Sequence, residues 1–209
     1  MAFTLGMAIA AMDKFNALIE ENKEYLTDLD SAIGDADHGI NMNRGMKRIV
    51  EKTHSKEYAD FGGLFRDAAM TIMSVVGGSA GPLYGTFFMK LGQKLGCANE
   101  IQVENFADAL REGLSGVMSL GKSAVGDKTM VDAIDPAIKA LKENASEGDA
   151  AAWNAAVAAA EHGMKDTVPM IARRGRASYL GERSIGHQDP GATSSYYLFT
   201  CFRDASAEN

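Results

Sequence analysis

The stretch AAMTIMSVVGGSAGPLYGTFFM, residues 68–89, carries no charged side chain over 22 positions and decides between two fold classes. An uncharged run of about 20 residues is long enough to cross a bilayer as one helix. Its centre, however, is Gly-Gly-Ser-Ala-Gly-Pro at residues 77–82, a turn signal that lipid-facing backbone does not tolerate. The stretch therefore predicts two buried helices joined by a glycine-rich turn, and no membrane span.

Helical periodicity extends outward from this stretch in both directions, with apolar residues recurring at three- and four-residue spacing. No segment alternates as a strand would, and no linker divides the chain, so we predict one all-α domain over residues 1–209. Pro136 should kink or end the sixth helix, and Pro169 should bend the seventh. The predicted helices span residues 4–25, 42–53, 61–76, 83–95, 103–120, 129–144, 149–173 and 192–203.

The chain is acidic, with 21 Lys and Arg against 28 Asp and Glu, giving a formal net charge of −7. A nucleic-acid-binding protein would show a basic stripe, so we expect no nucleic-acid partner. Phosphate ligands are not excluded, because a bound cation can reverse the local charge. The N-terminus has no basic leader, and Cys97 and Cys201 lack disulfide or metal-type spacing. We therefore expect a cytoplasmic protein with two buried, reduced thiols.

The four most polar or glycine-rich connections follow the first, third, fifth and seventh predicted helices. In an up-and-down arrangement, alternate connections lie at the same end of the helices. Topology alone therefore gathers four loops at one end, and we expect a ligand site there. These loops are residues 30–41, 77–82, 121–129 and 174–191.

The strongest chemical signal is the spacing Asp30-x4-Asp35-x-Asp37. Three carboxylates within eight residues repel one another unless a cation lies between them, and such oxygen ligands suit magnesium or calcium. An EF-hand loop fits only in part, because Met46 stands where the distal glutamate would be required. The alternative is an ordinary polar loop, since Asp is favoured at helix N-caps and turns.

The glycine-rich turn at residues 77–81 lies directly before a predicted helix. Backbone N–H groups at such a turn can bind a phosphate, helped by the helix dipole. The same sequence would also form an ordinary glycine turn, so the motif alone leaves both interpretations open.

Residues 116–123, GVMSLGKS, match the P-loop pattern letter for letter. A P-loop requires a strand before it and a helix after it. Here a helical pattern leads into the segment and a loop containing Gly126 and Asp127 follows. We therefore reject a P-loop and do not assign Lys122 to a phosphate.

The long loop at residues 173–187 contains four arginines, whose planar guanidinium groups suit phosphate oxygens. The same residues could equally form a solvated basic surface. His38 and His187 are better functional candidates than His54 and His162, which fall on helix surfaces. No nucleophile is paired with either candidate, so no general base is assigned.

Several segments together resemble the dihydroxyacetone kinase L family, in order and over nearly the whole chain. One departure lies in the glycine-rich turn, where the family often has a second hydroxyl residue and this chain has Ala80. Only the backbone N–H is therefore offered at that position. The matching segments are Leu29-Asp30, Ile33–Gly39, Gly77–Gly85, Gly126–Met130, Gly175–Ser184 and Gly186–Ala192.

The resemblance implies an eight-helix barrel that holds ADP or ATP and two magnesium ions at one end. It implies that Asp30, Asp35 and Asp37 are the metal ligands, and we assign Arg176 to the charge that develops on the γ-phosphoryl group. The implied nucleotide contacts are His38, Gly39, Ile40, Asn41, Gly78, Ser79, Ala80, Gly121, Met130, Arg176, Asp189, Pro190 and Gly191.

A chain of this size resembles the family version that works with two partner subunits. In that version ADP stays bound and a phosphotransferase-system subunit rephosphorylates it to ATP. The γ-phosphoryl group then passes to dihydroxyacetone on a K-type subunit. Two alternatives remain open: a kinase subunit for another short ketose or tetritol, and a non-enzymatic nucleotide-sensing partner of a regulator. A homodimer is also compatible with the sequence.

Overall fold

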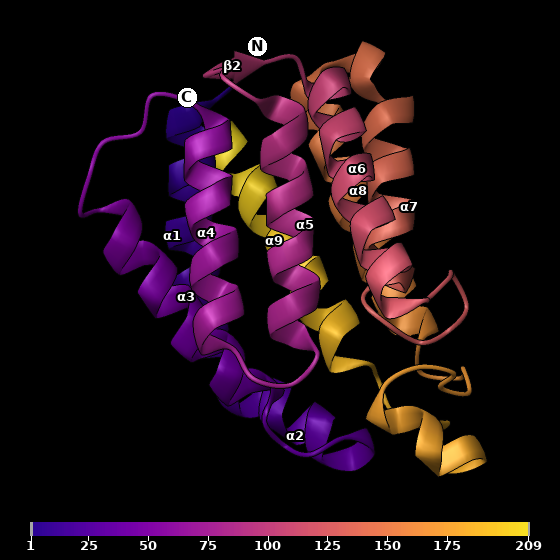
Figure 1. Ribbon diagram of the computed structural model, residues 1–209. Coiled ribbons are helices and arrows are strands. Elements are labelled where there is room, and N and C mark those ends of the chain that lie inside the picture. Colours follow the sequence, from indigo (N-terminus) through magenta and orange to yellow (C-terminus); the bar gives the residue numbers. More distant parts are fainter. Residues whose placement is uncertain (1, 209) are drawn as a thin grey trace.

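The computed structural model describes residues 2–208, which fold into α-helices, two 3-10 helices and one very small sheet (Figure 1). This confirms the all-α prediction. The α-helices are α1 (Leu5–Glu21), α2 (Lys23–Ile33), α3 (His38–Thr53), α4 (Phe61–Val75), α5 (Ala80–Leu95), α6 (Val103–Gly121), α7 (Val131–Glu143), α8 (Asp149–Asp166) and α9 (Pro190–Ala207). The 3-10 helices are η1 (Ala145–Glu147) and η2 (Arg176–Ser184).

Eight of these helices form a closed ring, because each packs against its neighbours and α9 packs against both α8 and α1. The order around the ring is α1, α3, α4, α5, α6, α7, α8 and α9. Helix α2 is the exception, since it lies across one end of the ring, where η2 is also found (Figure 1). Apolar helix faces point inward and make one continuous core.

Aromatic side chains fill the core near the opposite end of the ring. Phe3 lies 4.5 Å from Phe106 and 5.8 Å from Trp153, measured between ring centroids, and Phe106 lies 5.5 Å from Phe202. A two-stranded antiparallel sheet, with two residues in each strand, pairs β1 (Phe3–Thr4) with β2 (Glu100–Ile101) beside this cluster. Strands this short show no alternation, which is why the sequence gave no sign of them.

Helix α2 is the main element that the sequence analysis missed, since residues 30–41 were predicted as a polar loop. Its buried positions are Leu26, Asp30 and Ile33, which have helical spacing but include a carboxylate in the apolar stripe. The predicted first helix instead divides at Asn22, whose side-chain amide donates to the carbonyl of Leu18.

The predicted seventh helix is too long, because α8 ends at Asp166 and not near residue 173. Pro169 explains this, since it has no N–H to donate and disfavours helical geometry at the preceding residue. Pro136 behaves differently, because α7 continues through it. One thiol prediction was also wrong: Cys201 is buried, but Cys97 is exposed.

The uncharged stretch divides as expected, with α4 ending at Val75 and α5 beginning at Ala80. No helix in the described chain has the length and apolar character needed to span a membrane. The P-loop-like segment lies at the C-terminal end of α6, with Lys122 as its left-handed cap. No strand leads into it among the described residues, so the rejection of a P-loop is confirmed.

Candidate nucleotide and metal site

A cavity of about 320 Å³ opens at the end of the ring that carries α2 and η2. Its wall combines residues from the four loops that topology was expected to gather, so this expectation is confirmed. One side of the wall is polar, with carboxylates, a glycine-rich turn and arginines. The other side is apolar and includes Leu83, Val117, Leu120 and Met130.

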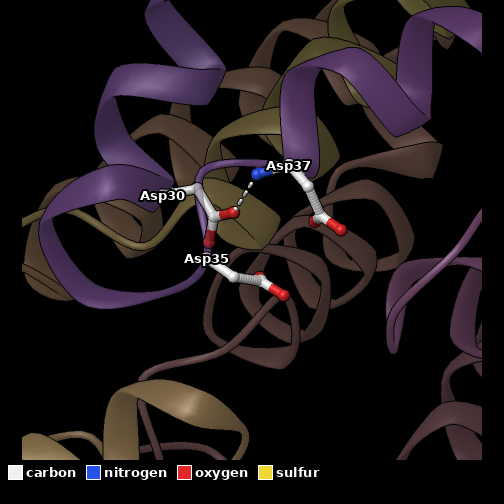
Figure 2. Close-up of side chains that lie close together, drawn as sticks. All are labelled: Asp30, Asp35 and Asp37. Carbon is white, nitrogen blue, oxygen red and sulfur yellow. Dashed lines mark hydrogen bonds between the residues drawn. The ribbon is translucent and has the colours of Figure 1, made fainter.

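The polar side contains Asp30, Asp35 and Asp37, which can each place one carboxylate oxygen within 4.8 Å of the others. Asp30 lies on α2, and its Oδ2 accepts the backbone N–H of Asp37 at 2.8 Å (Figure 2). The same oxygen accepts the backbone N–H of His38 at 3.1 Å. These bonds fold residues 34–37 back over the end of α2. The turn requires glycine at position 34, because a Cβ there would lie 2.0 Å from Oδ1 of Asp30.

Neighbouring cations balance only part of the negative charge of the three aspartates. Burial raises the pKa of Asp37, and the neighbouring carboxylates of Asp35 and Asp30 raise it further. One guanidinium group offsets part of this, since Nε of Arg176 lies 2.8 Å from Oδ2 of Asp35. Clustered carboxylate oxygens with unbalanced negative charge fit a hard divalent cation such as Mg²⁺.

The side chain of His38 belongs to a buried hydroxyl network. Its Nε2 lies 2.9 Å from Oγ of Ser194, and that hydroxyl lies 2.7 Å from the hydroxyl of Tyr84. Burial lowers the pKa of His38 to about 4, so the ring is neutral near pH 7 and cannot act as a cation. Tyr84 and Ser194 were not among the sequence candidates, because nothing in their spacing distinguishes them from core residues.

The glycine-rich turn lies beside the aspartates, and Gly78, Ser79 and Ala80 all line the cavity. Gly78 has φ +65°, and a Cβ on it would lie 3.9 Å from Oδ1 of Asp37. Helix α5 begins at Ala80, so its unpaired N-terminal N–H groups are close to the cavity. Such a turn can bind an anion such as phosphate.

Three of the nucleotide contacts implied by resemblance do not line the cavity: Gly39, Ile40 and Asn41. Gly39 allows α3 to pack on α2, because a Cβ there would lie 2.0 Å from the carbonyl oxygen of Lys23. Ile40 is 51% exposed, and Oδ1 of Asn41 accepts a hydrogen bond from Arg44. His187, the other candidate histidine, is exposed and also lies outside the cavity wall.

The apolar side of the cavity ends at Gly121 and Met130, beside the N-terminus of α9. A Cβ on Gly121 would lie 3.4 Å from Leu83, so glycine keeps this space open. Asp189 caps α9 by accepting the N–H of Ala192 at 2.7 Å, and Pro190 is the first residue of the helix. Burial raises the pKa of Asp189 to about 7. The apolar side chains on this side can pack against the face of a planar ring.

Comparison with known proteins agrees with this geometry. A family model described as the DAK2 domain matches residues 32–204. The chain is 44% identical over 193 residues to the ADP-binding subunit DhaL of the PEP-dependent dihydroxyacetone kinase of Escherichia coli, covering 91% of this chain and 92% of that protein. It is 41% identical over 199 residues to the corresponding subunit of kinase 1 of Listeria innocua, covering 95% and 96%.

The fold also matches a longer enzyme of known structure, the dihydroxyacetone kinase of C. freundii in complex with AMP-PNP and Mg²⁺. The TM-score is 0.73 and the sequence identity is 26%, with 96% of this chain and 33% of that chain covered. The fold and the site thus define an all-helical domain of the kind found in dihydroxyacetone kinases. The chain belongs to the DAK2 domain family, which confirms the resemblance found in its sequence.

Proposed function

We propose that this chain is the nucleotide-binding subunit of a dihydroxyacetone kinase. In this proposal it binds ADP or ATP with two magnesium ions and transfers the γ-phosphoryl group to dihydroxyacetone held on a separate K-type subunit. ADP is rephosphorylated in place by a phosphotransferase-system subunit. The observation that carries the proposal is that the three-aspartate cluster and a set of apolar side chains line the same cavity.

Asp30, Asp35 and Asp37 would hold the metal ions, which neutralise phosphate charge when bound. Backbone N–H groups at Gly78, Ser79 and Ala80 orient the phosphates, and the apolar wall excludes water from the base. Phosphoryl transfer depends mainly on such positioning and on electrostatic stabilisation.

Arg176 supplies the remaining positive charge in this proposal. Two magnesium ions carry fewer positive charges than three aspartates and the ATP tetra-anion carry negative ones, so a further cation is required. The position of its guanidinium group, beside Asp35 at the cavity, supports this assignment. The cavity wall has no evident sugar site, and none of its residues is assigned as a general base. Nε2 of His38 is hydrogen-bonded to Oγ of Ser194. We assign both functions to the K-type partner.

The first experiment asks whether the purified protein contains ADP. The protein is denatured and its supernatant is separated by anion exchange. Adenine nucleotide is expected, and its absence even after incubation with ADP and Mg²⁺ would contradict the proposal.

The second experiment measures phosphoryl transfer. The chain alone, with ATP and dihydroxyacetone, should show almost no turnover, whereas addition of a K-type subunit should allow one turnover from bound ATP. Sustained turnover should then require the phosphotransferase-system subunit. Many turnovers with free ATP alone would instead indicate an ATP-dependent kinase. Transfer only to another short ketose would change the substrate, and no transfer with ADP firmly bound would favour a nucleotide-sensing module.

A further inference from the structure

Lys128 is the one lysine or arginine among residues 2–208 that is buried, with 1% of its surface exposed. It lies in the loop between α6 and α7, where its backbone adopts the left-handed region with φ +62°. Burial of an ammonium group is costly unless the group is fully hydrogen-bonded. A lysine held in this way therefore indicates a specific role for its contacts.

The contacts of Lys128 are two backbone carbonyls of one segment. Its Nζ donates to the carbonyl of Ser184 at 2.6 Å and to that of Met170 at 3.2 Å. These carbonyls belong to residues 167–189, which we name the arginine arm because it carries Arg176. Among the described residues no carboxylate lies within ion-pair distance of Lys128, and burial lowers its pKa. The hydrogen bonds of the lysine therefore go to carbonyls of the arm, and the negative charge of Asp189, at the end of the same arm, favours its charged form.

The arginine arm has little apolar packing of its own. Its buried apolar residues, Ala172 and Ala177, form a small cluster with Ile33 of α2. Hydrogen bonds within the arm fix much of its conformation. Oγ of Ser184 accepts the N–H of Ala172 at 2.9 Å and donates to the carbonyl of Gly181 at 2.7 Å. Lys128 links two points within this folded segment, residues 170 and 184, to the loop that follows α6.

We propose that Lys128 is a positioning residue for phosphoryl transfer and acts through Arg176. By fixing residues 170 and 184, it holds the arm so that the guanidinium group of Arg176 stays 2.8 Å from Asp35. The inference rests on the proposed function, because the arginine matters only if phosphoryl transfer occurs at this cavity. Displacement of such a group by about 1 Å is enough to slow a reaction by about a hundredfold.

The test compares Lys128→Met with Lys122→Met. Both lysines lie in the same loop and both have positive φ, so the substitutions impose similar backbone demands. Lys122 does not line the cavity. With the K-type subunit, we expect Lys128→Met to slow single-turnover transfer by about a hundredfold. Its dissociation constant for ADP should change by less than about threefold, and Lys122→Met should resemble the wild type.

Limited trypsin digestion provides a measurement that does not depend on catalysis. The arm contains the exposed side chains of Arg173, Arg174, Arg176 and Arg183, and release of the arm should free the backbone at these sites for cleavage. Cleavage in the arm should be faster in Lys128→Met than in Lys122→Met. Equal cleavage rates would overturn the inference, even if the wild-type protein proved to transfer nothing and the proposed function failed.

A double-mutant cycle shows whether the lysine acts through the arginine. In the Arg176→Ala background, Lys128→Met should cause no further loss of transfer, because the group that it positions is gone. Independent, multiplicative losses would overturn the inference. If Lys128→Met does not fold, Ser184→Ala serves instead, since it removes the hydroxyl bonds within the arm but keeps the carbonyl. Slower transfer and faster cleavage in the arm are expected, and wild-type behaviour in both would overturn the inference.

Discussion

The guanidinium group of Arg176 and the carboxylate of Asp35 meet at 2.8 Å, although they come from loops more than 130 residues apart in sequence. Arg176 is largely exposed and Asp35 is partly exposed, so this ion pair contributes little to stability. Its significance is positional, because it brings the arginine arm to the three aspartates.

Arg176→Ala should therefore slow phosphoryl transfer more than it weakens ADP binding. An arginine that stabilises the transferring group contributes about a thousandfold or more to the rate in related chemistry. The rate should be measured in single turnover with the K-type subunit, and ADP affinity by calorimetry. Arg183→Ala, on the same arm but outside the cavity wall, is the matched control. Equal losses of rate and affinity would reduce Arg176 to a binding residue.

Asp37→Asn should change thermal stability in opposite directions with and without ligand. Without metal it should stabilise the fold, because it removes a charge from a cluster that raises the pKa of Asp37. With Mg²⁺ and ADP it should abolish the ligand's stabilisation, which is about 2.7 kcal/mol at a hundredfold excess over the dissociation constant. Asp35→Asn should weaken nucleotide binding in the same way.

Melting curves with and without EDTA measure this effect. Asp28→Asn is the control, because Asp28 is an exposed aspartate on α2 outside the cavity. Wild-type melting in the presence of ADP that does not respond to EDTA would exclude a metal bridge.

Asp189 should make stability depend on pH between about 4 and 7. Its pKa is raised to about 7 in the folded protein, above its ordinary value of about 3.9. Between these two pKa values the folded state binds a proton that the unfolded chain has lost. The contribution of Asp189 to the free energy of unfolding therefore decreases as pH rises from about 4 through 7. Asp189→Asn, which retains a capping oxygen, should reduce that decrease by about 1–2 kcal/mol in urea titrations at pH 5 and 7.5. An unchanged pH profile would contradict the raised pKa.

Lys122→Ala should leave ADP affinity nearly unchanged. In a P-loop the equivalent lysine contacts phosphate directly, and its loss is severe. Here Lys122 caps α6 and does not line the cavity. Calorimetric titration of ADP into both proteins is sufficient, and a large loss of affinity would require a different phosphate site.

Periodicity was enough to predict the ring helices, because their apolar faces are regular and their connections contain Gly and Pro. It failed at α2, where a buried carboxylate, Asp30, occupies the position between Leu26 and Ile33 that an apolar residue would normally fill. The buried carboxylate of Asp30 thus hid the helix that carries it. It also failed for the arginine arm, whose shape depends on polar bonds to Ser184 and not on an apolar stripe.

The cavity followed from topology, since alternate connections in an up-and-down ring meet at one end. The details did not follow, because they depend on side chains that meet only in three dimensions. Lys128 reads as an ordinary loop lysine in the sequence, and Ser194 as a small polar residue on a helix. Their partners, a carbonyl for Lys128 and an imidazole and a hydroxyl for Ser194, are far away in the chain, and no local pattern encodes them. The roles of individual site residues remain predictions.

The two ends of the described chain lie at the same face of the ring, where β1 begins and α9 finishes, opposite the cavity (Figure 1). Any domain, tag or surface linker attached at either end would consequently project away from the mouth of the cavity. Such a fusion leaves the mouth sterically free for a docking protein. A tethered partner could reach the cavity only through a linker that spans the full length of the helices. The length of that linker would therefore determine whether the partner can bind at the cavity of its own chain.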